Sequence, residues 1–223
     1  MTNVLAAALA PARVVDSDHP AVIAFAREVT AGAYDDRERA VRLSAAVRDG
    51  FRYDPYTIDL SPAGSSASRV LASGRGWCVT KAALLAAACR VVGVPARVGY
   101  ADVRNHLSTQ RLREAMGTDE FFWHGYTAIH LDGRWLKATP SFNIELCRKM
   151  RLAPLDFDGR CDAVMHAFDE TGRRHMEYLR FRGEFDDVPV DRIRRTFDEC
   201  YPNLARLDQS SFDQDVAAES RPD

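Results

Sequence analysis

The sequence predicts an α+β fold in which one apolar helix packs on an antiparallel sheet. The helix is indicated by residues 79–92, which contain no Gly or Pro and consist mainly of Ala, Leu and Val. A helix that is apolar on nearly all faces is normally buried, so we expect it to be central. The sheet is indicated by residues 124–131 and 134–140, which flank Asp132-Gly133, a dipeptide that favours a two-residue hairpin turn.

Length and composition indicate one globular domain. The chain has 223 residues, of which 46% are hydrophobic and 28% charged, and this composition supports a sizeable core. We expect a single domain over residues 1–204. Residues 205–223, in which Ser, Gln and Asp recur, are expected to form a polar, disordered tail.

Charge and cysteine content argue against several functional classes. The formal net charge is −2, so no basic field favours nucleic acid. No apolar run approaches the roughly 20 residues of a membrane span, and the apolar N-terminus lacks the basic start of a signal peptide. The five cysteines include no CxxC pair, so neither a disulfide framework nor a zinc site is indicated. We therefore expect a cytoplasmic protein with no metal, no cofactor, no nucleic acid and no membrane partner.

Helices and an extended segment are predicted before the central helix. Asp18 can cap a first helix, and Asp35 followed by Glu38 has the spacing of a capping box before a second. Residues 51–58 (FRYDPYTI) are aromatic and contain a proline, which indicates an extended segment. A loop of Ser, Gly and Ala over residues 61–68 then leads towards the central helix.

Cys78 lies in the first turn of the central helix, which Gly93 and Pro95 bring to an end. A thiol at a helix N-terminus meets free N–H groups and the positive end of the helix dipole. Both favour thiolate, so we expect a lowered pKa and a nucleophile near neutral pH. Most unpaired cysteines are inert core residues, and Cys89 on the same helix fits that alternative better. Position alone leaves both readings of Cys78 open.

The hairpin places four polar residues on one face of the sheet. Counting outward from Asp132-Gly133, Tyr126 opposes Thr139 and His124 opposes Ser141, so all four share a face. Before the hairpin, residues 96–101 are predicted to form a strand. Residues 105–122 are predicted to be a polar, partly helical excursion, and residues 165–179 offer a second hairpin.

A thiol nucleophile needs a base to take its proton, and His124 is placed to be that base. The combination of Gly76-Trp77-Cys78, Gly93-Val94-Pro95-Ala96-Arg97, His124 and Thr139-Pro140 resembles the catalytic core of the transglutaminase-like superfamily, a branch of the papain-like cysteine enzymes. The resemblance covers roughly residues 35–143. It implies a papain-like fold, with Cys78 as the nucleophile and His124 as the base.

The sequence departs from the family pattern at the residue that orients the histidine. The family usually has Asp before Pro, and this chain has Thr139. A Thr hydroxyl can accept the imidazole N–H and hold its tautomer, but it cannot stabilise imidazolium as a carboxylate does. Asp102, at the end of the preceding strand, and Asn143, two residues beyond Ser141, are the second and third candidates for this role.

Several other side chains are candidates for the substrate cleft. Trp77 precedes the nucleophile and can form a wall of the cleft. Tyr53 and Tyr56 can supply an oxyanion donor if their segment runs beside the Cys78 helix. Tyr126 shares the predicted face of His124, and His106 belongs to the excursion that we expect to border the cleft.

The predicted reaction is acyl transfer through a thioacyl-enzyme on an amide or thioester substrate. The acceptor can be water, as in a protease-like hydrolase or amidase, or an amine, as in an acyltransferase. As a natural-product enzyme, the protein would act as an amide synthase or Dieckmann-type cyclase on a thioester bound to an acyl carrier protein. Arginines in residues 148–151, 173–174 and 192–195 could meet such an acidic partner or a substrate carboxylate. A catalytically silent peptide-binding module is the alternative that the missing Asp supports.

Overall fold

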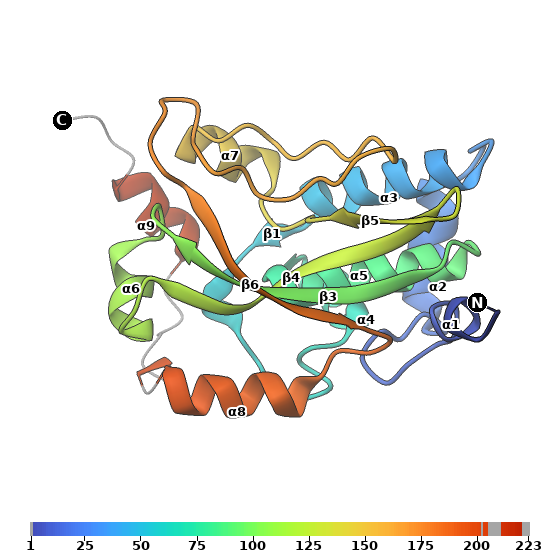
Figure 1. Ribbon diagram of the computed structural model, residues 1–223, viewed down its shortest axis with the longest axis horizontal. Helices are drawn as coiled ribbons and strands as arrows, with labels where there is room; N and C mark the ends of the chain where they lie inside the picture. Colours follow the sequence, from blue (N-terminus) through green and yellow to red (C-terminus); the bar gives the residue numbers. More distant parts are fainter. Residues whose placement is uncertain (1, 202, 205–210, 220–223) are drawn as a thin grey trace.

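The computed structural model describes residues 2–201, 203–204 and 211–219. A four-stranded antiparallel sheet of order β5-β4-β3-β6 crosses the molecule, with α5 behind it (Figure 1). The strands of this sheet are β3 (Ala96–Asn105), β4 (Glu120–Leu131), β5 (Arg134–Ala138) and β6 (Met176–Phe185). A short parallel pair, β1 (Arg52–Tyr53) and β2 (Arg75–Gly76), lies before α5 in the chain. This arrangement confirms the predicted α+β class.

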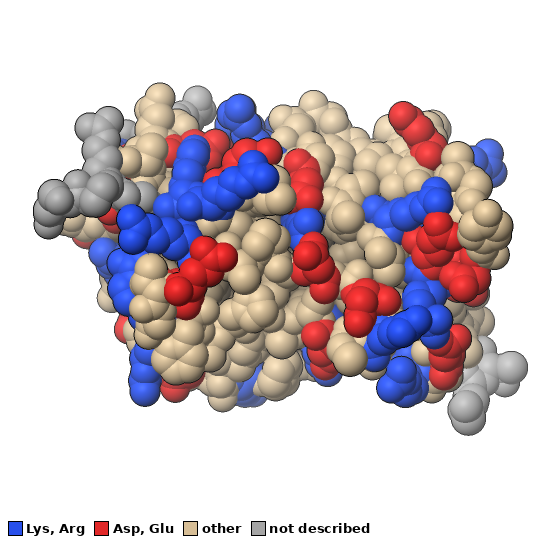
Figure 2. Space-filling model, turned by 90° about the horizontal axis from the view of Figure 1, so that it is seen from above, with Lys and Arg blue, Asp and Glu red and all other residues tan. Residues whose placement is uncertain are grey.

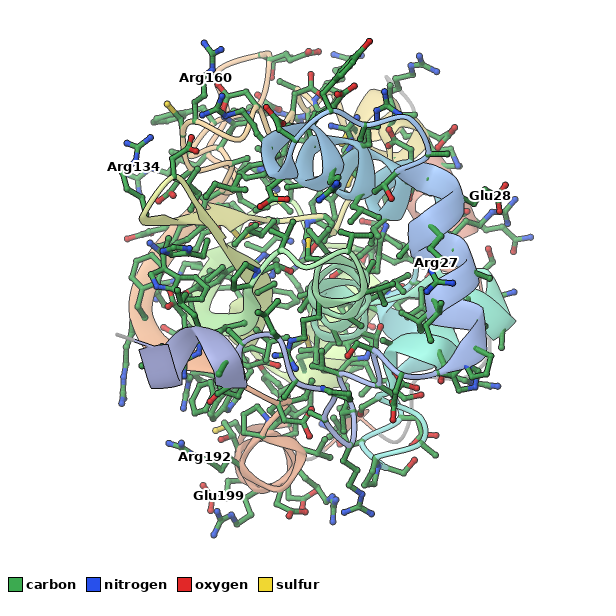
Figure 3. The ribbon with its side chains drawn as sticks, turned by 90° about the vertical axis from the view of Figure 1, so that its right-hand side faces the viewer. Arg27, Glu28, Arg134, Arg160, Arg192 and Glu199 are labelled. Atoms are coloured by element: carbon green, nitrogen blue, oxygen red, sulfur yellow. The ribbon has the colours of Figure 1, made fainter. Side chains whose placement is uncertain are left out.

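The helices surround this sheet, and α5 lies at the centre of the molecule. Figure 3 views α5 end on, with α2 and α3 beside it and α8 at the lower edge. The helices are α1 (Thr2–Ala7), α2 (Pro20–Val29), α3 (Asp36–Gly50), α4 (Ala67–Ser73), α5 (Cys78–Val91), α6 (Gln110–Met116), α7 (Ile144–Met150), α8 (Val190–Cys200) and α9 (Phe212–Glu219), and a 3-10 turn spans Pro55–Thr57. Among the described residues, no helix has the length and apolarity to cross a membrane.

The central helix forms where the sequence predicts it. All residues of α5 from Cys78 to Arg90 are buried. At its start, the Thr80 hydroxyl accepts a hydrogen bond from the backbone N–H of Trp77 (3.1 Å). At its end, Gly93 takes a left-handed φ of 80°, which is the conformation expected of a glycine that terminates a helix.

The hairpin turn at Asp132-Gly133 also forms as predicted. Both turn residues have positive φ, 50° and 78°, as a type I′ turn requires, and Leu131 pairs with Arg134. The ladder ends at Thr127 and Ala138, so the predicted pairs of Tyr126 with Thr139 and His124 with Ser141 are wrong. Pro140 has no N–H to continue the ladder.

The first helices differ from the prediction at one cap. Asp35 caps α3 as predicted, because its side chain accepts from the backbone N–H of Glu38 (2.8 Å). Helix α2 begins at Pro20 instead of being capped by Asp18, and His19 takes the capping position. Proline is well suited to the first helical position because its φ is already fixed there, and this moves the cap to the residue before it.

The predicted tail needs correction over part of its length. Residues 205–210 and 220–223 lie outside the described residues. Phe212–Glu219, which the composition assigns to a disordered tail, forms helix α9. Its Phe212 ring packs edge-on against the rings of Tyr53 (5.7 Å) and Tyr56 (5.4 Å). The buried side chains of Phe212 and Val216 hold this short helix on the domain, together with polar contacts of Asp213, Asp215 and Glu219.

Candidate active site

Cys78 is the first residue of α5, and it is 6% exposed. Burial raises the pKa of its thiol to about 11, although the backbone N–H groups of Gly125, Val79 and Cys78 itself act in the opposite direction. The expectation of a lowered pKa for the Cys78 thiol is therefore wrong. The helix N-terminus favours thiolate as predicted, but removing the sulfur from water disfavours it more.

The strand that carries His124 packs against the start of α5. Gly125 follows His124 in β4, and a Cβ built on Gly125 would stand 2.8 Å from the carbonyl oxygen of Cys78. Only glycine therefore allows β4 to approach the start of α5 this closely. Burial, and to a smaller extent His175, lowers the pKa of His124 to about 4. Near neutral pH Cys78 is therefore a thiol and His124 a neutral imidazole, which is the protonation state expected of a general base.

His124 lines a small enclosed cavity together with Tyr53, Phe142 and Phe212. The cavity volume is about 20 Å³, which is enough for one water molecule. The Nε2 atom of His124 is buried without a hydrogen-bond partner among the described residues. Buried polar atoms are nearly always partnered, so a water or a substrate group is expected at this nitrogen.

Thr139 is the orienting candidate whose side chain is still available. It is 3% exposed, and its hydroxyl has no hydrogen-bond partner among the described residues. The phenol of Tyr178 is close by. Burial raises the pKa of Tyr178 to about 12, and the nearby Thr139 hydroxyl acts in the opposite direction. The two hydroxyl groups do not have the geometry of a hydrogen bond.

The other two orienting candidates have their polar atoms engaged elsewhere. The Oδ1 of Asp102 accepts from Arg182 Nε (2.5 Å) and from the backbone N–H of Trp123 (3.2 Å). The Oδ1 of Asn143 accepts from the backbone N–H of Tyr53 (3.0 Å), and its Nδ2 donates to Glu145 (2.8 Å). Neither hydrogen-bonds His124, and the orienting role of Thr139 stays a prediction.

Replacing Thr139 with valine should lower the rate of acyl transfer about 10- to 100-fold, or about 1.4–3 kcal/mol in the barrier. The isosteric change keeps the packing and removes only the hydroxyl that can fix the imidazole tautomer. Steady-state kinetics measure the effect. Thr127→Val is the matched control, because Thr127 is also buried but its hydroxyl donates to the Ala82 carbonyl (2.9 Å). Equal rates for Thr139→Val and wild type would show that Thr139 does not orient His124.

The cleft candidates separate into inner and outer residues. Tyr53 lines the cavity of His124, and Trp77 is buried with its Nε1–H unpartnered among the described residues. The Tyr56 hydroxyl donates to Asp215 (2.7 Å), so it is not a free oxyanion donor. The remaining candidate on β4, Tyr126, packs on the ring of Phe181 (6.2 Å) and is outside the cavity, contrary to its predicted place beside His124.

Trp123, which precedes His124 in β4, has a left-handed φ of 61°. His106 also lies away from the cavity. It is partly exposed, with its Nε2 3.7 Å from Glu177, and it borders an outer pocket instead.

Two buried residues near the site were missed in the sequence. Lys81 is fully buried in α5, and its Nζ donates to the carbonyls of Arg48 (2.9 Å), Phe51 (2.7 Å) and Ser141 (2.8 Å). A single lysine within an otherwise apolar helix is a signal that could have found it. His175 is 1% exposed and lies near enough to His124 to affect its pKa. His175 lies beside a predicted turn, and no feature of the sequence there indicated a buried residue near the site.

The buried histidines predict that the protein loses stability in mild acid. Burial lowers the pKa of both His124 and His175 from 6.5 to about 4. The folded state therefore binds fewer protons than the unfolded state, so the stabilisation is complete above pH 6.5 and is lost as pH falls through 4. At pH 4.5 each should contribute a loss of about 2 to 3 kcal/mol. Urea unfolding at pH 7.5 and 4.5 measures it, and His175→Phe should reduce the difference. An unchanged difference would contradict the assignment.

A sequence model of the transglutaminase-like superfamily matches residues 23–140. The chain belongs to the transglutaminase-like superfamily. The match includes Cys78, His124 and Thr139, whereas Asn143 and the helices α7 to α9 lie beyond it. Among the described residues of this transglutaminase-like protein, no group of His, Cys, Asp and Glu is arranged to hold a metal ion.

Two solved structures resemble the transglutaminase-like chain. A candidate cysteine protease from Cytophaga hutchinsonii is 16% identical, with a TM-score of 0.48, over 82% of this chain and 57% of that one. A candidate protease from Parabacteroides distasonis is also 16% identical, with a TM-score of 0.39, over 57% of this chain and 26% of that one. The chain thus spans little more than half of the first structure and about a quarter of the second. The comparison with curated proteins gave no match.

Proposed function

We propose that the protein transfers acyl groups through a thioacyl-enzyme on Cys78. The observation that carries the proposal is the meeting of α5 and β4, where Gly125 lets the His124 strand reach the carbonyl of Cys78. Neutral His124 accepts the thiol proton as sulfur attacks an amide or thioester carbonyl. The resulting imidazolium then protonates the leaving group, and His124 later deprotonates the acceptor.

The tetrahedral intermediate needs hydrogen-bond donors for its oxyanion. The backbone N–H of Cys78, at the start of α5, is one donor. The indole N–H of Trp77 is a second candidate, because it is buried beside Cys78 in the chain and has no partner among the described residues. We assign these two groups to the oxyanion site.

The acceptor remains open between water, an amine and a carbon acid. Cys78 is only 6% exposed, so bulk water has little access to a thioacyl group on its sulfur, which supports an acyltransferase, amide synthase or cyclase. The cavity at His124 has room for about one water, which a hydrolase would need. A protein that binds peptides without reacting is the competing function, and Thr139 in place of Asp is the observation that favours it.

Mass spectrometry of the intact protein tests the proposal. The protein is incubated with an acetyl thioester and with a peptide amide, each with and without an added amine. We expect an acyl adduct from at least one substrate in wild type and none in Cys78→Ala. Cys89→Ala is the matched control, because Cys89 is also buried in α5 and burial raises its pKa to about 12. Adducts that persist in Cys78→Ala, or no adduct from any substrate, would overturn the proposal.

The identity of the probe that reacts distinguishes the possible acceptors and substrates. An adduct from the thioester alone favours a biosynthetic acyltransferase or cyclase, and an adduct from the amide favours a protease-like hydrolase. Exposure, in contrast, decides the order in which general reagents label the thiols. Cys161 is exposed and Cys78 is buried, so general thiol reagents should modify Cys161 before Cys78.

A further inference from the structure

A second, larger pocket opens between α6, α7 and α9. Its volume is about 340 Å³. It is lined by His106, Leu107, Ser108, Thr109, Arg113, Lys149, Met150, Arg151, Arg173, Val216 and Glu219. Seen from above, basic side chains gather at the same end of the molecule (Figure 2). Two of the arginine-rich stretches that the sequence shows, 148–151 and 173–174, therefore contribute to one concave surface.

The charges of this outer pocket do not balance. Four cationic side chains and one carboxylate line it. Lys149 pairs with Asp213 (3.5 Å) and Arg173 with Asp169 (2.8 Å), so these two cations are neutralised locally. The Arg113 guanidinium donates to the carbonyl of Ser108, and Arg151 is exposed on the surface.

Arg113 and Arg151 therefore leave a net positive charge in the pocket. Neither makes an ion pair with a carboxylate of the described residues. The single acidic lining residue, Glu219, is already engaged by the backbone N–H of Gln110 (2.9 Å). Against the one carboxylate of Glu219, these two arginines still leave an excess of positive charge in the pocket. Guanidinium groups bind phosphate and carboxylate oxygens through paired N–H donors, so the pocket has the chemistry of an oxyanion receptor.

The outer pocket adjoins the cavity of His124. Ser108 and Met150 line both. Helix α9 covers the two in succession, because Phe212 lines the inner cavity while Val216 and Glu219 line the outer pocket. At a rise of about 1.5 Å per residue, the positions of Phe212 and Glu219 are roughly 10 Å apart along α9. A substrate that reaches both sites must therefore be long and thin.

We propose that the outer pocket binds the anionic end of the acyl substrate, a phosphate or a carboxylate, while its carbonyl reaches Cys78. This inference rests on the proposed function. With a thioester, a bond forms between Cys78 Sγ and the acyl carbon, and the bond from that carbon to the leaving sulfur breaks. The thiol proton passes through His124 to the leaving thiolate. The anion is carried by the leaving thiol, so it holds the substrate without taking part in the bond changes.

Matched pairs of probes test this assignment. Acetyl-phosphopantetheine and acetyl-pantetheine carry the same thioester with and without a phosphate. S-acetyl peptide thiols that end in a carboxylate or a carboxamide make the second pair. We expect at least one anionic probe to acylate Cys78 roughly tenfold faster than its neutral counterpart, as the loss of a charge-assisted hydrogen bond predicts. Whichever pair shows the preference identifies the anion.

The variants decide whether the preference comes from the outer pocket. Arg113→Gln combined with Arg151→Gln should remove the preference, so that the anionic probe acylates Cys78 no faster than its neutral counterpart. Arg27→Gln is the matched control, because Arg27 is exposed on α2, away from this pocket (Figure 3). Equal rates within both pairs for wild type, or a preference that survives in the double variant, would overturn the assignment.

A binding measurement separates this inference from the proposed function. Inorganic phosphate is titrated into Cys78→Ala while the amide signals of Ser108 and Arg151 are followed by NMR. We expect saturable shifts that disappear when Arg113→Gln and Arg151→Gln are added. If these shifts are seen but no probe acylates Cys78, the pocket stands and the acyl-transfer proposal fails. If acylation occurs but phosphate causes no shifts and no probe pair differs, the acyl-transfer proposal stands and the pocket assignment fails.

Discussion

Replacing His124 with alanine should slow acyl transfer at least about 1,000-fold, because the thiol then has no base to accept its proton. Burial holds the pKa of Cys78 near 11, so very little thiolate exists at neutral pH without that base. The remaining rate should rise with pH, since hydroxide can then generate the thiolate directly. Acylation kinetics between pH 6 and 10, on the wild type and the variant, measure both effects.

A second histidine of the same strand controls for damage to β4. His130 is partly exposed and packs on the ring of Trp135 (5.1 Å), and the structure places it outside the inner cavity. His130→Ala should keep the wild-type rate. Circular dichroism confirms that each variant is folded. A His124→Ala protein that is folded and reacts within tenfold of wild type would show that His124 is not the base.

Replacing Lys81 with methionine should destabilise the protein by about 3 kcal/mol or more. The side chain is completely buried, and its Nζ donates to three carbonyls from two segments, the end of α3 and the loop after β5. Methionine fills a similar volume but supplies no donor, so the carbonyls of Arg48, Phe51 and Ser141 lose these partners inside the protein. Buried acceptors without partners cost about 1–3 kcal/mol each. The free energy of unfolding in urea measures the loss.

A lysine on the surface gives the comparison for this substitution. Lys137 is partly exposed and pairs with Asp162 at 3.5 Å, an interaction of the kind that contributes about 0–1 kcal/mol. Lys137→Met should therefore change stability little. If Lys81→Met is as stable as Lys137→Met, the three hydrogen bonds of Lys81 do not hold these segments together.

The parts of the fold that could be predicted depend on local sequence. Helix α5 is bounded by Cys78 and Gly93 within one continuous stretch, and the hairpin depends on Asp132-Gly133 alone. Both are decided by residues that are adjacent in the chain, where propensity and turn geometry dominate.

The parts of the site that could not be predicted depend on distant residues. Asp102 is engaged by Arg182, which is 80 residues away, and Asn143 by Tyr53, which is 90 residues away. The position of α9 depends on aromatic rings from an early segment of the chain. The direction of the Cys78 pKa shift also follows from burial, which no local pattern reports. The sequence could therefore identify Cys78 and His124 as the candidate nucleophile and base, but not their protonation states or the residue that orients the histidine.

The contact at Gly125 means that the spacing of β4 and α5 beside Cys78 is set by backbone against backbone. A methyl group at Gly125 would also stand 3.0 Å from the Cα of Val79, so there is no flexible side chain that could move aside. Any residue larger than glycine at position 125 would therefore have to push the strand that carries His124 away from the helix that carries Cys78.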